Sequence, residues 1–256
     1  MIKQSLIIAN QTFKEIYQSK ILLNILILGV AIAMAIYVSS EMTYGAAPRV
    51  GLDIGLGVLS LSSVGIAIFM GSTLIDKEVK NRTLYMIISR PVSRTSFYIG
   101  KMLGLSSILF INILLLFLFV LLLYWLVGGH GHYLIPWSAL FIFVESLVML
   151  FAVVFLSLLT NTILTVLFSL TLYIAGHAVE SVRDTMLFKS EKGLSLFIDL
   201  YAKLMPNFSK FNIKSFVLYK GELSHTYLFS SLAYAFLWIF ILGTISAWIM
   251  NKKDFS

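Results

Sequence analysis

Residues 134–179, LIPWSALFIFVESLVMLFAVVFLSLLTNTILTVLFSLTLYIAGHAV, decide the fold of this chain. As one helix the stretch would be about 69 Å long at 1.5 Å per residue, more than twice the roughly 30 Å hydrocarbon thickness of a bilayer. The chain must therefore fold back, and the polar triplet Thr160, Asn161 and Thr162 offers the turn. We predict a tight hairpin of two membrane-spanning helices.

The composition of the whole chain is that of a membrane protein. Of its 256 residues 59% are hydrophobic and 12% are charged, against about 25% charged in an ordinary soluble domain. The formal net charge of +7 lies mostly beside the apolar runs, which argues against a nucleic-acid partner. The chain has no cysteine, so it has neither a disulfide framework nor a thiolate metal site.

Six apolar runs are long enough to cross a bilayer, which takes about 20 helical residues. They cover residues 21–40, 54–75, 97–127, 134–159, 162–179 and 227–250. We therefore predict an all-α membrane protein that forms a single transmembrane domain over residues 1–256.

Basic residues near span ends stay on the cytoplasmic side of a membrane, and this rule sets the orientation. With both termini and residues 76–101 inside, the cytoplasmic pieces hold eleven Lys or Arg against four Asp or Glu. The other side then holds eight basic and seven acidic residues. We expect a multi-pass protein of the inner (plasma) membrane with both termini in the cytoplasm.

The first twenty residues lack the apolar core and cleavage site of a signal peptide. Apolar side chains recur in them at helical spacing, with polar side chains elsewhere on the helical wheel. The apolar positions are Ile2, Leu6, Ala9, Phe13, Ile16 and Tyr17. This pattern predicts an interfacial helix over residues 1–20 on the cytoplasmic leaflet, although a polar lead-in to the first span would look similar.

Residues 180–226 form the one long hydrophilic stretch, and on this topology they are extracytoplasmic. They are too rich in leucine and aromatic residues for a disordered tether, so we expect short amphipathic helices there. Pro206 and Asn207 would end one of these helices.

No catalytic motif is visible in the chain. Gly100-Lys101 is followed by Met102 and lacks the upstream glycine of a phosphate-binding loop, so this chain does not use that motif to hydrolyse ATP. The sequence Gly129-His130-Gly131-His132 supplies two imidazoles where a metal site needs three or four ligands, and it is typical of an exposed turn. We expect no enzyme, no cofactor and no metal.

Polar side chains inside the spans are candidates for a transport path. Glu145 lies midway along the fourth span, where an ionised carboxylate costs several kcal/mol unless it faces protein or water. It is either a lining or proton-linked group of that path, or a structural carboxyl bonded to Asn112, Asn24 or Ser146. Asn112 and Asn24 are themselves expected to form interhelical hydrogen bonds.

Residues 75–94, IDKEVKNRTLYMIISRPVSR, carry the most informative pattern in the chain. Dense charges give way to five apolar residues that could dock in a groove on another protein. Pro91 disfavours helix at Arg90, and Ser93 is placed to cap the next helix. The alternative is an ordinary basic loop whose charges only fix the topology.

This stretch resembles the permease subunits of type-2 ABC exporters, including those of transporters that assist nitrous oxide reductase maturation. The shared pattern is an acidic and basic cluster, then Gly or Arg followed by Thr-Leu, several apolar residues and Arg-Pro-Val-Ser-Arg. Here it occupies residues 76–78, 82–84 and 90–94, followed by Gly100-Lys101. A looser likeness covers the whole chain, including the segment 204–212 before the last span.

The resemblance implies an ATP-driven exporter. It implies a homodimer of six-span subunits in membrane lipid, each with an amphipathic elbow helix and docked on a separate ABC ATP-binding subunit through a coupling helix within residues 76–96. The residues that it places at the contact with that subunit are Asp76, Glu78, Arg82, Thr83, Leu84 and Met86. Arg82 stands where many relatives have glycine. Two alternatives remain: a scaffold that moves no substrate, and a proton-coupled secondary transporter that uses Glu145.

Overall fold

The computed structural model describes residues 2–17, 21–42, 47–80, 93–183, 199–219 and 221–252, and no β-strand occurs among them. The helices are α1 (Ile2–Tyr17), α2 (Ile21–Met42), α3 (Ala47–Lys80), α5 (Arg94–Leu126), α6 (Leu134–Leu159), α7 (Thr162–Arg183), the 3-10 helix η1 (Phe208–Phe211), α10 (Lys214–Leu218) and α11 (His225–Lys252). The predicted all-helical class is confirmed.

Five of these helices are long and apolar enough to cross a membrane. They span Ala47–Leu74, Arg94–Leu126, Leu134–Leu159, Thr162–Glu180 and His225–Lys252, and each overlaps one of the predicted spans. In α2 the apolar segment found is shorter, Ile27–Val38. The chain is therefore a multi-pass membrane protein.

The predicted hairpin is confirmed at its turn. Helix α6 ends at Leu159 and α7 begins at Thr162, and the Thr160 and Thr165 hydroxyls lie 2.9 Å apart across the turn. The Leu164 N–H donates to the Asn161 side-chain oxygen at 3.0 Å, which satisfies a donor of the first turn of α7. Polar side chains thus replace the missing backbone hydrogen bonds where the chain reverses.

The predicted start of α5 agrees with the structure, whereas the predicted limits of α3 do not. The Ser96 N–H donates to the Ser93 hydroxyl at 3.2 Å, so Ser93 caps α5 as predicted. Helix α3 instead extends well beyond the predicted span 54–75 at both ends. Pro48 lies in its first turn, where a missing N–H costs nothing, so no residue stops the helix there.

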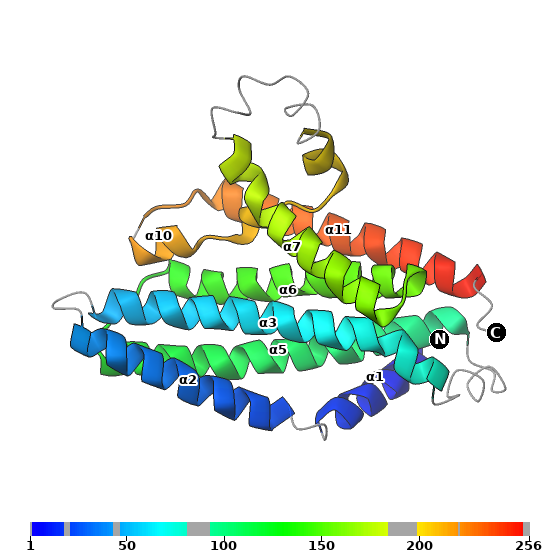
Figure 1. The fold of residues 1–256 in the computed structure, drawn as a ribbon, viewed down its shortest axis with the longest axis horizontal. Helices are drawn as coiled ribbons and strands as arrows, with labels where there is room; N and C mark the ends of the chain where they lie inside the picture. The colour runs from blue at the N-terminus through cyan, green and yellow to red at the C-terminus, as the bar shows by residue number, and fades with distance from the viewer. Residues whose placement is uncertain are drawn as a thin grey trace.

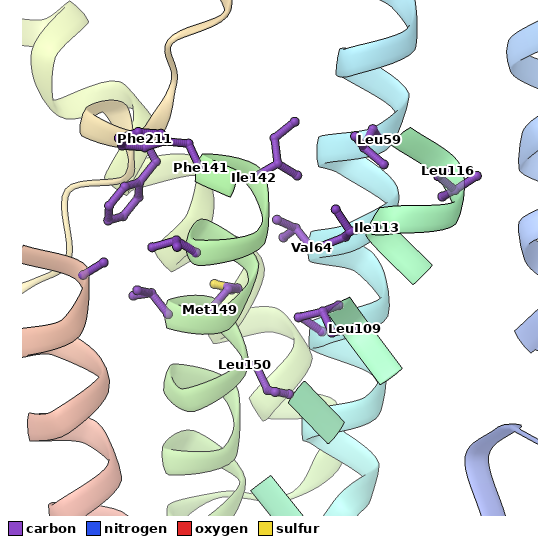
Figure 2. Packing of buried hydrophobic residues seen from close by; sticks show 14 of the residues in the cluster. Leu59, Val64, Leu109, Ile113, Leu116, Phe141, Ile142, Met149, Leu150 and Phe211 are labelled. Atoms are coloured by element: carbon purple, nitrogen blue, oxygen red, sulfur yellow. The ribbon is translucent and has the colours of Figure 1, made fainter. Parts of the chain in front are cut away.

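Helix α3 packs along both α5 and α6, and these three helices form the centre of the molecule (Figure 1). Figure 2 shows the apolar core that they share, with Phe141 of α6 beside Phe211 of η1. The core residues labelled there are Leu59, Val64, Leu109, Ile113, Leu116, Phe141, Ile142, Met149, Leu150 and Phe211.

Both termini lie at one end of this bundle, which we call the basal end (Figure 1). Helix α1 packs against the beginning of α5, and the Arg94 guanidinium donates to the backbone oxygen of Asn251 at 3.1 Å. The basal end therefore gathers α1, the start of α5 and the end of α11. We call the other end, which holds the turn 127–133 and α10, the distal end.

Candidate functional site

At the basal end α1 and α5 approach each other at backbone distance. A Cβ atom added to Gly100 would lie 2.7 Å from the backbone oxygen of Ser5, and one added to Gly104 would lie 2.7 Å from Cβ of Thr12. Both distances are below van der Waals contact, so this approach needs glycine at both positions. A larger side chain at either position would push the two helices apart.

Three faces run along α1. Ser5 and Thr12 are buried against α5, whereas Leu6 is 57% exposed and Lys14 is exposed. At 100° per residue Leu6 and Phe13 lie beside the protein-facing stripe, and Lys14 lies opposite it. A helix with one face on protein, one apolar face and one charged face suits the membrane interface. The apolar stripe was predicted from the sequence, but the small-residue face that contacts α5 was not.

Of the residues predicted to contact an ATP-binding subunit, only two have a described backbone. Asp76 and Glu78 lie in the last turns of α3, on the same continuous helix as the second predicted span. Their side chains, together with Arg82, Thr83, Leu84 and Met86, lie outside the described residues.

A carboxylate and an imidazole meet inside the membrane-spanning region. Glu145 of α6 is 3% exposed, and its Oε1 lies 2.8 Å from Nε2 of His177 on α7. When Nε2 carries a proton it donates to this oxygen. Ser146, one of the expected partners of Glu145, instead donates its hydroxyl to the backbone oxygen of Ile142 at 2.8 Å.

The spacing of Glu145 and His177 in the sequence could have predicted this pair. Glu145 and His177 are 32 positions apart, and Asn161 lies midway between them in the turn of the hairpin. Residues equidistant from the turn of an antiparallel helix pair lie at the same height, so the predicted hairpin could have brought the two together.

The pair lies on the wall of a cleft of about 610 Å³ between α3, α6, α7 and the segment from η1 to α10. The ring of Tyr173 packs edge-on against His177, with the centroids 4.6 Å apart, and its hydroxyl faces Ser60 and Glu145. Most of the remaining wall is apolar. It includes Leu56, Leu61, Ile142, Ile174, Phe211 and Ile213.

An ion pair lies at the distal side of the same cleft. Nζ of Lys214 is 2.9 Å from a carboxylate oxygen of Asp53, and these side chains are 30% and 53% exposed. Lys214 lines the cleft beside Gly57. The cleft thus has a buried acidic group on its inner wall and a solvated, mutually neutralised pair at its rim.

The segment around η1 holds α7 in place at this level. Phe208 packs directly on Gly176, and the Ser209 hydroxyl donates to the backbone oxygen of His177 at 2.8 Å. The N–H of Asn207 in turn donates to the Tyr234 hydroxyl on α11 at 2.9 Å. The predicted break at Pro206 and Asn207 is therefore a structured connection that fixes the register of His177.

The other polar candidates lie apart from the cleft. Asn112 is 1% exposed in α5, and neither of its amide atoms has a hydrogen-bond partner in the part of the chain that the structure describes. Asn24 lies in α2, and its side chain is outside the described residues.

The two histidines of the distal turn accept local hydrogen bonds, His130 through its backbone oxygen and His132 through a ring nitrogen. The backbone oxygen of His130 accepts from the Tyr124 hydroxyl at 2.8 Å, and Nδ1 of His132 accepts from the Leu134 N–H at 3.4 Å. Within the described ranges no three His, Asp or Glu side chains are grouped to hold a metal ion.

In comparisons with known proteins, no family model matches this chain and no curated protein matches it.

Proposed function

We propose that this chain is the transmembrane permease subunit of an ATP-driven ABC exporter. In this proposal it has six spans, with α2 as the first, both termini in the cytoplasm and the basal end facing inward. It works as a homodimer, and a separate ATP-binding subunit hydrolyses ATP beneath each copy.

The observation that carries this proposal is the close contact of α1 with α5 at Gly100 and Gly104. The segment whose pattern resembles a coupling helix lies between the end of α3 at Lys80 and the start of α5 at Arg94. A push on that segment reaches α3 and α5 directly, and it reaches α1 and α11 through contacts at the same end. This arrangement suits a membrane subunit that is moved from its basal end.

Charge supports the inward orientation of that end. Lys3, Lys14, Arg94, Lys101 and Lys252 all lie on the elements that meet there. Basic residues flanking spans are retained in the cytoplasm, so these positions favour the basal end as the cytoplasmic one.

In the proposed mechanism nucleotide binding draws two ATP-binding subunits together and shifts the coupling segment. Helices α1 and α5 follow as one body, and the spans rock so that a path along the dimer interface opens outward. The ATP-binding subunits must bind the two states of the permease with different affinity, because otherwise ATP could not bias the equilibrium.

The test is co-purification from native membranes. The tagged chain should retain a protein with a phosphate-binding loop and ATPase activity, and the double variant L84D/M86D should lose it, because charges would disrupt an apolar contact. Retention of the ATPase by L84D/M86D at the wild-type level would overturn the proposed contact, and the absence of any such ATPase would overturn the proposal.

A matched control is available on the described surface. Leu204 is 61% exposed and Met205 is 42% exposed, in the segment that the proposal places outside the cell. L204D/M205D makes the same chemical change and should leave co-purification intact. Both double variants should reach the membrane in equal amounts.

A second candidate is a proton-coupled secondary transporter, which the Glu145 and His177 pair favours. A carboxylate 2.8 Å from an imidazole inside the spans could exchange protons during a transport cycle. Glu145→Gln separates the two functions. A proton-coupled carrier should lose pH-dependent uptake into vesicles, whereas an ATP-driven exporter should keep its ATP dependence.

A further inference from the structure

The inner wall of the cleft carries a buried carboxyl group whose neighbours are an imidazole and a phenol. Glu145 is 3% exposed; it lies 2.8 Å from the His177 imidazole, whose side chain is 26% exposed, and it faces the Tyr173 hydroxyl. A neutral imidazole donates a hydrogen bond to a carboxylate but supplies no positive charge. A cation that reached Glu145 would form a stronger, charge-assisted hydrogen bond.

The other charges of the cleft do not oppose a cation. Among the described residues that line the cleft, Lys214 is the one lysine or arginine, and Asp53 lies 2.9 Å from its Nζ. The two charges cancel at the rim, where solvent also screens them. An anion, in contrast, would meet a buried carboxylate at the inner wall and find no uncompensated positive partner there.

The walls suit an apolar or aromatic body. Tyr173 presents an aromatic ring, and Leu61 and Ile174, both 66% exposed, supply aliphatic surface. Aromatic faces attract cations as well as apolar groups. At about 610 Å³ the cleft lies within the range of 300–1,000 Å³ that is usual for small-ligand sites.

We propose that this cleft binds an amphipathic organic cation, namely a protonated amine attached to an apolar or aromatic body. The ammonium takes the place of the His177 imidazole as donor to Glu145, and the body lies against Tyr173, Leu61 and Ile174. The binding site stands without the ATPase partner, but its place on an export route rests on the proposed function. The cargo of that route is then a cationic amphiphile.

The test uses dansylcadaverine, a fluorescent primary amine with an aromatic body, and its neutral N-acetyl derivative. The permease is reconstituted alone in lipid nanodiscs, and empty nanodiscs give the partition background. We expect saturable binding of the amine with a blue shift of its emission. The N-acetyl derivative should bind at least about tenfold more weakly, because it has no ammonium to place on Glu145.

The variants locate the site. Glu145→Gln should weaken binding of the amine at least about tenfold, whereas Glu222→Gln, an exposed acid outside the cleft, should leave binding unchanged. If Glu145→Gln does not fold, a steric pair on α7 replaces it. Ile174 lines the cleft and is 66% exposed, and Ile163 is 74% exposed on the same helix.

Ile174→Trp should narrow the cleft and weaken binding several-fold, and Ile163→Trp should not. Equal binding of the two probes, or wild-type affinity in both Glu145→Gln and Ile174→Trp, would overturn the inference. Because no ATPase is present, a negative result here leaves the co-purification test untouched. Failure of co-purification likewise leaves the binding site intact.

Discussion

Two helices on opposite sides of the molecule are held in different ways. Helix α1 meets α5 through glycines, with backbone and Cβ atoms in direct contact at Gly100 and Gly104. Helix α7 meets α6 beside a cleft, where the His177 imidazole is hydrogen-bonded to the Glu145 carboxylate, and Gly176 of α7 packs under Phe208 of η1. The first contact leaves no room for a side chain, and the second leaves room for a ligand.

The difference shows how one apolar bundle can combine a rigid part with an adaptable one. Lipid tails are as apolar as leucine, so membrane helices gain little by burying leucine alone. Close backbone packing fixes a geometry because any displacement loses many contacts at once. A polar pair beside a cavity can exchange its partner while the surrounding helices stay in place.

The largest expected effect breaks the first contact. Gly104→Leu would push a side chain into Thr12 and the backbone oxygen of Ala9, which cannot rotate away. We expect a loss of about 3 kcal/mol of stability, at the upper end for overpacking, with α1 becoming sensitive to protease. Thermal unfolding, monitored by size-exclusion chromatography, measures the loss of stability. Limited proteolysis measures the exposure of α1.

Gly65→Leu is the matched control for this substitution. Gly65 lies in α3, and an added Cβ there meets nothing within 4 Å. Since leucine is the better helix former, this variant should be unchanged or slightly more stable. Equal losses in the two variants would show that the α1 contact has no special role.

The second prediction concerns the polar pair. His177→Leu removes the hydrogen bond to Glu145 and leaves a carboxylate on an apolar wall, so we expect a loss of about 2 kcal/mol. In a Glu145→Gln background the same substitution should cost less than about 1 kcal/mol, since no charge is left behind. A double-mutant cycle on thermal unfolding measures the coupling, and additive losses would contradict it.

Local signals explain what the sequence predicted well. The turn at Thr160 and Asn161 and the cap at Ser93 each depend on side chains bonding to backbone within a few residues. The contact of α1 with α5 joins segments about 95 positions apart through glycines, which carry no hydrophobic signal. The contact of Glu145 with His177 was intermediate in predictability, because it can be inferred from the sequence only after the hairpin has been predicted.

The third prediction tests a polar group on the rigid side of the bundle. Asn112 is buried in α5, and its amide has no hydrogen-bond partner among the residues described. An unsatisfied buried amide costs roughly 1–3 kcal/mol, so Asn112→Leu should raise stability by about 1 kcal/mol. A fall in melting temperature would instead show that the amide bonds to a group outside the described residues or to a bound molecule.

The smallest effect distinguishes the rim of the cleft from its inner wall. Lys214 and Asp53 are 30% and 53% exposed, so their attraction is screened by solvent and Lys214→Gln should cost only about 0.5 kcal/mol. The loss should shrink further in high salt, whereas the loss in His177→Leu should not, because a buried pair is screened much less. Lys214→Gln also leaves Asp53 without its partner at the mouth of the cleft. Binding of dansylcadaverine should therefore strengthen by about twofold, the factor that roughly 0.5 kcal/mol represents, and weaker binding would show that Lys214 contacts the ligand itself.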